Sequence, residues 1–109
     1  MLVGRRMRTS LITVMPDATL AHARELLHSH RIRHLPVVDA DRLVGIVTDR
    51  DIRQASPSST AGISSDQTVA FLAKIRVEEA MVRHVRTVSP YTPIEEAARL
   101  MIAHKIGCL

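Results

Sequence analysis

The sequence predicts an α+β fold built from two copies of a β-α-β-β-α unit, of which the second copy is truncated. Three observations predict it: a repeat within the sequence, an amphipathic helical segment in each copy, and a pair of β-branched apolar runs around a turn. The chain has 109 residues, of which 46% are apolar, so it has the size of one ordinary domain and enough apolar residues to form a core.

The repeat appears when the sequence is shifted against itself by 74 positions. Residues 3–35 then align with residues 77–109 without a gap. A match of this length indicates two copies of one structural unit. We therefore expect a first repeat at 1–55, a connecting segment at 56–76 and an incomplete second repeat at 77–109. Identical pairs include Val3 and Val77, Met7 and Met81, Pro16 and Pro90, Ala23 and Ala97, and His30 and His104.

The first copy begins with a short strand and a helix. The stretch SLITVMP at 10–16 is apolar and ends in a proline, which favours a strand that stops there. The following residues, 17–30, have apolar side chains at helical spacing, and either Asp17 or Thr19 can cap the start. The expected buried face of this helix consists of Leu20, Ala23, Leu26 and Leu27.

Two further apolar runs, Leu35–Val38 and Leu43–Val47, surround a turn-forming stretch at 39–41 and predict a β-hairpin. A helix is expected to start at Thr48 and run through Ala55. The Ser-, Pro- and Gly-rich stretch 56–67 predicts a mobile loop, and the spacing of apolar residues over 69–81 predicts a helical connector.

These residues resemble the tandem cystathionine β-synthase (CBS) domain pair. The resemblance rests on HLPVVD at 34–39, LVGIVTDRDI at 43–52 and the doubled TVxP stretch with its following helix. The resemblance covers nearly the whole chain. Within the family, the sequence is most similar to small bacterial stand-alone pairs of the acetoin-utilisation type. The resemblance implies two units packed about a pseudo-twofold axis, with clefts that accept adenosine nucleotides or S-adenosyl ligands, and regulation rather than catalysis.

The second copy departs from this pattern because the sequence stops at Leu109, where the first copy continues through Pro36 into its hairpin and last helix. An incomplete sheet would expose apolar surface and strand edges. We therefore expect a longer natural chain, or a partner that supplies the rest. At most one complete site of the family type is expected from these residues.

Thr48 and Asp51 have the spacing of a capping box, which needs no ligand. Helix N-termini also suit phosphates, and a carboxylate can accept both hydroxyls of a ribose. The resemblance implies that Asp51 holds the ribose hydroxyls and that Thr48 contacts ribose or phosphate, with Arg50 nearby. The two roles can coexist in one turn.

By the same resemblance, the bed for the adenine comes from the second copy, at the strand before Pro90 and the segment after the second helix. The residues expected there are Val85, Arg86, Ser89, Ile106 and Gly107. Lys105 is the expected phosphate partner, although a solvated lysine near a helix end explains it equally well. A mirror cleft would use Met15, Ile32, Arg33 and His34, although a basic pair in a connector is more often solvated surface.

Catalytic and metal-binding roles find little support. His30 and His34 are four residues apart but leave a helix before Pro36, and no cysteine or carboxylate completes a zinc set. We expect His22 and His28 on the solvated face of the first helix. Cys108 has no matched base, so we expect an inert, packed thiol, no enzymatic activity and no required cofactor.

The net charge of +4 favours an anionic partner without saying which. Only Phe71 and Tyr91 are aromatic and the basic residues are scattered, which disfavours nucleic acid. We find no apolar segment long enough to span a membrane and no signal peptide, and the single cysteine fits a reducing compartment, so we expect a cytoplasmic protein.

Two main functions remain open from the sequence, beside a third that only the basic charge suggests, an anion-triggered regulator of a nucleic-acid-binding partner. In the first, the pair senses an adenine nucleotide or S-adenosyl ligand and modulates an unidentified partner protein. In the second, it is a ligand-free scaffold for dimerisation or interaction, and Thr48 and Asp51 only cap a helix. The resemblance and the unfinished second copy both favour a homodimer.

Overall fold

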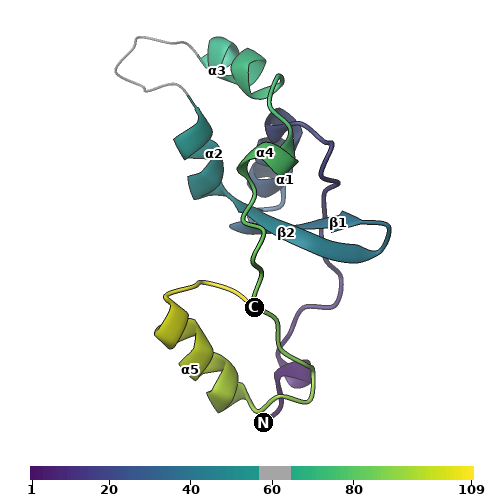
Figure 1. Cartoon of the computed structure of the whole chain (residues 1–109), viewed down its shortest axis with the longest axis vertical. Coiled ribbons are helices and arrows are strands. Elements are labelled where there is room, and N and C mark those ends of the chain that lie inside the picture. Colours follow the sequence, from purple (N-terminus) through teal and green to yellow (C-terminus); the bar gives the residue numbers. More distant parts are fainter. Residues whose placement is uncertain (57–64) are drawn as a thin grey trace. The chain divides into compact units, whose positions relative to one another are not determined.

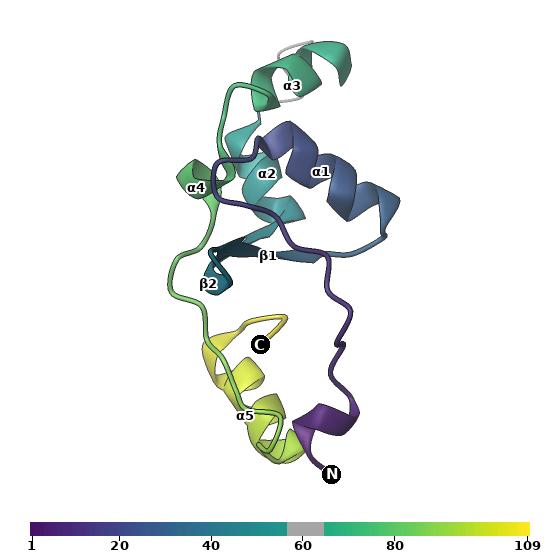
Figure 2. The ribbon, with the colours of Figure 1, turned by 90° about the vertical axis from the view of Figure 1, so that its right-hand side faces the viewer.

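A β-hairpin and two helices form the core of residues 12–84, one of two compact units into which the chain divides. The computed structural model describes residues 1–56 and 65–109. Strands β1 (His34–Asp39) and β2 (Arg42–Thr48) pair antiparallel, and helices α1 (Leu20–Ser29) and α2 (Asp49–Ala55) cover one face of the pair (Figures 1 and 2). The expected mixture of helices and strands is confirmed. The fully buried side chains of this core include Leu20, Leu27, Leu35, Val37, Val47 and Ile52.

The hairpin forms where the sequence predicts it, because a two-residue turn joins two β-branched strands. Ala40 and Asp41 have φ values of 49° and 64°, the left-handed conformation that a tight hairpin turn requires at both central positions. Buried Leu35, Val37 and Val47 alternate along the strands with partly exposed residues, as the period of two predicts. The hairpin thereby places Thr48 at the end of β2, directly before α2.

The helix α1 has the expected amphipathic pattern. The Thr19 hydroxyl accepts a hydrogen bond of 3.1 Å from the backbone N–H of His22, so Thr19 caps the helix. Leu20, Ala23 and Leu27 are buried, and Leu26 lies partly exposed against the core.

Two expected elements of this unit differ in the structure. The strand predicted at 10–16 is reduced to one bridge, in which Val14 pairs with Val37 of β1. A turn closed by the bond from Ala18 N–H to Met15 C=O, 3.1 Å, follows immediately and ends the pairing.

The expected connector helix is also wrong in detail. The chain forms α3 (Ser65–Leu72) and α4 (Val77–Ala80), because the residues between them bond to the segment before α1. The Leu20 N–H donates to Ile75 C=O at 2.9 Å, and the Val77 N–H donates to Ala18 C=O at 2.8 Å. Part of the predicted loop at 56–67 is helical, since α3 begins at Ser65, and the rest of it, 57–64, lies outside the described residues.

The other unit combines residues 1–11 with residues 85–109, and its main helix is α5 (Ile94–His104). The 3-10 helix η1 (Val3–Arg5) begins the chain. The N–H of Val3 donates to Thr92 C=O at 2.9 Å, and the N–H of Ile94 donates to Met1 C=O at 2.9 Å. Shifted by 74 positions, these are the two bonds that join 75–77 to 18–20 in the first unit. The start of each repeat therefore bonds to the body of the other repeat.

The strand predicted before Pro90 is not formed, since residues 83–89 have no regular secondary structure. The matching residue of the first copy, Val14, is held in its bridge by Val37 of β1, and in the described residues Val88 of the second copy forms no such bridge. Ala97 is the one buried hydrophobic residue of α5.

Candidate functional site

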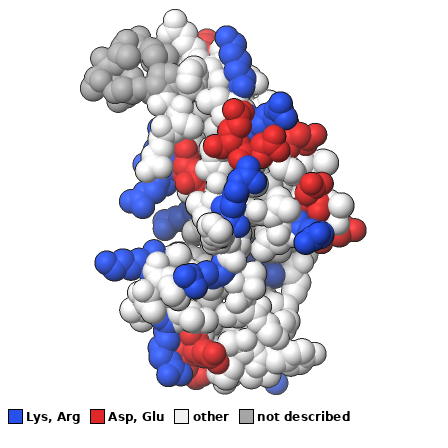
Figure 3. All heavy atoms as spheres, in the orientation of Figure 1, with Lys and Arg blue, Asp and Glu red and all other residues white. Residues whose placement is uncertain are grey.

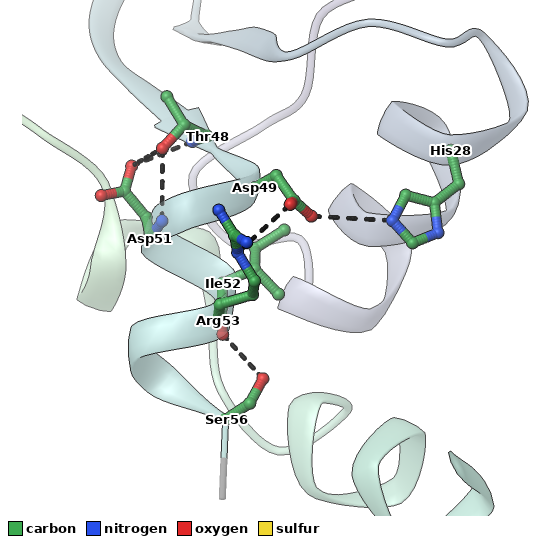
Figure 4. A network of polar contacts seen from close by, with 7 residues as sticks. All are labelled: His28, Thr48, Asp49, Asp51, Ile52, Arg53 and Ser56. Atoms are coloured by element: carbon green, nitrogen blue, oxygen red, sulfur yellow. Dashed lines mark hydrogen bonds and ion pairs between the residues drawn. The ribbon is translucent and has the colours of Figure 1, made fainter. Parts of the chain in front are cut away.

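The turn that joins β2 to α2 carries a complete capping box (Figure 4). The Asp51 backbone N–H donates to the Thr48 hydroxyl oxygen at 3.2 Å, and the Thr48 backbone N–H donates to Oδ2 of Asp51 at 2.9 Å. The Thr48 hydroxyl also donates to Oδ2 at 3.0 Å. The predicted cap is thus confirmed, and both residues are only partly buried.

The two bonds that the Asp51 carboxylate accepts both use the same oxygen, Oδ2. In the described part of the chain, Oδ1 of Asp51 has no hydrogen-bond partner, and in Figure 4 it points away from Thr48. An ionised carboxylate offers about four acceptor positions. Asp51 can therefore cap α2 and accept hydrogen bonds from a ligand at the same time.

The Thr48 side chain has less left to offer. A hydroxyl has one hydrogen and two lone pairs. Its hydrogen goes to Asp51, and one lone pair accepts from the Asp51 N–H. In this arrangement the free lone pair suits a donor such as a ribose hydroxyl and not a phosphate oxygen, which needs a donor.

A second polar contact at this turn was missed from the sequence. Oδ1 of Asp49 lies 3.6 Å from Nε2 of His28 on α1, and its Oδ2 lies 3.3 Å from Nε of Arg53. The spacing of Asp49 and Arg53 within one predicted helix could have revealed their pair. The contact with His28 joins separate elements, and no local pattern announces it. His22 and His28 are exposed, as expected.

The other expected site residues divide between the two units. Arg50 is exposed on α2, beside the capping box. The residues expected to form the adenine bed and the phosphate contact belong to the unit of residues 1–11 and 85–109, whereas Thr48 and Asp51 belong to the unit of residues 12–84, so the joint cleft stays a prediction. Of these, Val85 and Ile106 are partly buried, whereas Arg86, Ser89, Lys105 and Gly107 are exposed.

Lys105 ends α5 in the left-handed conformation, with φ of 53°. Arg31 occupies the same place after α1 and has the same φ of 53°. Both corners are closed by matching bonds, from Ile32 N–H to Leu27 C=O and from Ile106 N–H to Met101 C=O, each 3.0 Å. The repeat is therefore preserved in backbone detail at the corner that carries the expected phosphate partner.

Ser89 uses its hydroxyl locally, because it accepts a bond of 3.1 Å from the Tyr91 N–H. Cys108 is half-buried, and burial raises the pKa of its thiol, which favours the protonated form at neutral pH. Over residues 1–56 and 65–109, no three His, Cys, Asp or Glu side chains are grouped to hold a metal ion. None of the helices described is long and apolar enough to cross a membrane.

Charged side chains of both signs are interspersed on the face of the molecule drawn in Figure 3. A protein that binds the nucleic-acid backbone usually gathers its Lys and Arg side chains into one stripe or patch. In each of the two units, the view in Figure 3 shows Lys and Arg side chains next to Asp and Glu side chains.

Comparison with known proteins identifies relatives of this chain. Residues 3–58 and 77–109 match the CBS domain family. A CBS domain-containing protein of Dictyostelium discoideum is 37% identical over 109 residues, which cover 99% of this chain and 75% of that protein.

Solved structures resemble the chain over nearly its whole length. An acetoin utilization protein (AcuB) from Vibrio cholerae has a TM-score of 0.79 at 30% identity and covers 98% of this chain, which spans 73% of that one. The CBS domain pair of protein MJ0100, in complex with 5′-methylthioadenosine and S-adenosyl-L-methionine, has a TM-score of 0.76 at 30% identity over 97% of this chain and 75% of its own. The structure of CBSX2 in complex with AMP has a TM-score of 0.75 at 29% identity over 96% of this chain and 78% of its own.

Proposed function

Because this chain belongs to the CBS domain family and carries a tandem pair of its repeats, we propose that it is a regulatory module that binds an adenosine-containing ligand. The three ligands in the related structures share an adenosine and differ in what is attached to its 5′ carbon. The adenosine, with its ribose 2′ and 3′ hydroxyls, is therefore the part that a common site would recognise.

The open oxygen of Asp51 carries this proposal. A carboxylate that only caps a helix needs no free acceptor, and here Oδ2 alone satisfies the cap. Oδ1 is free to accept hydrogen bonds from ribose hydroxyls, and the Thr48 hydroxyl oxygen has one free lone pair for the same purpose. We expect Arg50, which lies between Thr48 and Asp51 in the sequence, to face a 5′ phosphate. We expect Val85, Arg86, Ser89, Ile106 and Gly107 to line the adenine, and Lys105 to contact phosphate.

Regulation would follow from ligand-dependent packing of the two repeats, which would bias a partner protein. A module of this kind needs no catalytic group and no required cofactor. We also expect two copies to form a homodimer. The exposed apolar side chain of Ile102, 78% exposed on α5, supports such an interface. A strictly monomeric species in sedimentation at high concentration would contradict the dimer.

Calorimetric titration with 5′-methylthioadenosine and AMP tests the ligand. The informative variant is Asp51→Asn, because an amide oxygen can still accept the capping bonds but lacks the charge. Charge-assisted bonds are worth about 1.5–3 kcal/mol each, so the affinity should fall by about tenfold or more. Asp39→Asn, a change of an exposed carboxylate at the end of β1, is the matched control and should bind as the wild type does.

The outcomes separate the two functions. If Asp51→Asn bound both ligands as tightly as the wild type, Asp51 would be a helix cap without a ligand role. If the wild type bound neither ligand, the complete capping box would favour the ligand-free scaffold instead.

A further inference from the structure

We propose that His28 is a positioning residue for the adenosine site and makes the affinity of that site depend on pH through Asp49. The inference rests on the proposed function, because it concerns the same turn. His28 belongs to α1 and does not itself belong to the capping box; it acts on the turn through the Asp49 carboxylate.

Asp49 lies at the start of α2, between the two residues of the capping box. Its carboxylate is held from two sides, by Nε2 of His28 at 3.6 Å and by Nε of Arg53 at 3.3 Å. Figure 4 shows the Asp49 side chain directed toward α1, on the side of α2 away from the Asp51 carboxylate. The pair with His28 therefore ties the first turn of α2 to α1, and that turn carries the open oxygen of Asp51.

Each element that packs against α1 carries charged groups, and Asp49 is the one that the structure pairs with His28. From α2, Asp49 and Arg53 face it. His28 lines a groove of about 760 Å³ on α1, together with His22, Arg24 and Glu25 of the same helix and Val69 of α3. The acidic residue of α3 is Asp66, and β1, which also packs on α1, carries His34 and Asp39.

Histidine is the side chain whose charge ordinarily changes between about pH 5 and 8. A protonated imidazole attracts the Asp49 carboxylate, whereas a neutral one does so only weakly. Lower pH should therefore hold the turn more firmly in its observed position. The side chains of His28 and Asp49 are 58% and 42% exposed, so solvent and salt screen the pair and the effect on affinity is modest.

The first copy has a histidine at this helix position, and the second copy does not. Shifting by 74 positions places Ile102 of α5 at the position of His28, and isoleucine does not titrate. The contact with Asp49 thus accompanies the copy that carries Thr48 and Asp51, and α5 has an apolar side chain at the equivalent position.

The test is calorimetric titration with 5′-methylthioadenosine at about pH 5.5 and about pH 7.5, below and above the middle of the usual histidine range, at low salt. This ligand has no phosphate that would itself titrate. The wild type should bind about two- to fivefold more tightly at the lower pH, as expected for an exposed pair. His28→Gln and Asp49→Asn should each abolish this pH dependence, and the double variant should lose no more than either.

His22→Gln is the matched control, since His22 is an exposed histidine of the same helix that forms no pair with Asp49, and it should keep the full pH dependence. The inference is overturned if the wild type binds equally at both pH values, if His28→Gln keeps the pH dependence, or if it weakens binding by the same factor at each pH. Absence of wild-type binding at both pH values would overturn the proposed function, and the inference with it; binding without pH dependence would overturn the inference alone.

Discussion

Gly45 is a single residue on which the packing of β2 depends. A Cβ atom built at this position would lie 2.6 Å from Sδ of Met81 and 2.9 Å from the backbone oxygen of Val82. Val82 exchanges two backbone hydrogen bonds with Ile46, 2.8 and 3.0 Å long, so this backbone lies against the edge of β2. Only a glycine admits so close an approach.

The variant Gly45→Ala should therefore destabilise the protein. The Met81 side chain can move, but the Val82 carbonyl is fixed by its bonds to Ile46, and overpacking of this kind costs about 1–3 kcal/mol. Urea unfolding should show a lower midpoint with an unchanged slope. An unchanged midpoint would mean that the segment at Val82 does not pack on β2 as described.

Cys108 gives a prediction about pH. Burial raises the pKa of its thiol, so the folded state favours the neutral form. The contribution of Cys108 to the free energy of unfolding is therefore lost as pH rises through the pKa of the thiol in the unfolded state and then through its pKa in the folded state. Since the thiolate is the nucleophile, iodoacetamide at mildly alkaline pH should alkylate Cys108 more slowly in the folded protein than in urea. Equal rates in the two states would contradict the burial of the thiol.

Local spacing was enough to predict the capping box, because Thr48 and Asp51 are neighbours on one helical turn. It could not predict which carboxylate oxygen the cap would use, or that Asp49 would reach His28, since the latter contact depends on how α1 and α2 pack. The Oδ1 atom left open is thus a property of the folded turn and not of its sequence pattern.

At the level of elements, the sequence did not reveal that the start of each repeat forms hydrogen bonds with the other repeat. The connector has apolar residues at helical spacing, but α3 ends at Leu72, and Ile75 and Val77 form backbone hydrogen bonds with the segment at 18–20. Tertiary hydrogen bonds of this kind override local propensity. The α1 helix, the hairpin and α2 were predicted correctly because their signals are local: a cap, a turn and a strict periodicity.

The bond from Val3 N–H to Thr92 C=O predicts a selective effect. Val3→Pro removes the donor at the first position of η1, where proline is otherwise tolerated. Amide exchange measured by mass spectrometry should become faster in α5, because the start of this helix loses its attachment, while α1 keeps its protection.

Val77→Pro is the reciprocal variant, since the Val77 N–H bonds to Ala18 C=O within the unit of residues 12–84. It should accelerate exchange in α1 and leave α5 unaffected. If Val3→Pro left α5 exchange unchanged, or if both variants affected both helices equally, the assignment of each repeat start to the opposite repeat would be wrong.

For the molecule as a whole, the two copies share backbone conformation at matching positions. Residues that differ between the copies give each copy its own side-chain chemistry. The corners at Arg31 and Lys105 have the same φ, yet α1 has His28 where α5 has Ile102. Sequence comparison of the copies predicted the shared backbone. It led to the proposed ligand site only through resemblance to a family, because no local pattern relates the Thr48–Asp51 turn of the first repeat to residues of the second repeat.

The central claim is that the Thr48–Asp51 turn holds the ribose of an adenosine-containing ligand. A crystal structure of the protein with AMP tests it most directly. The account predicts Oδ1 of Asp51 within hydrogen-bond distance of a ribose hydroxyl, with Oδ2 still bonded to Thr48. AMP bound elsewhere, with Asp51 contacting only Thr48, would contradict it.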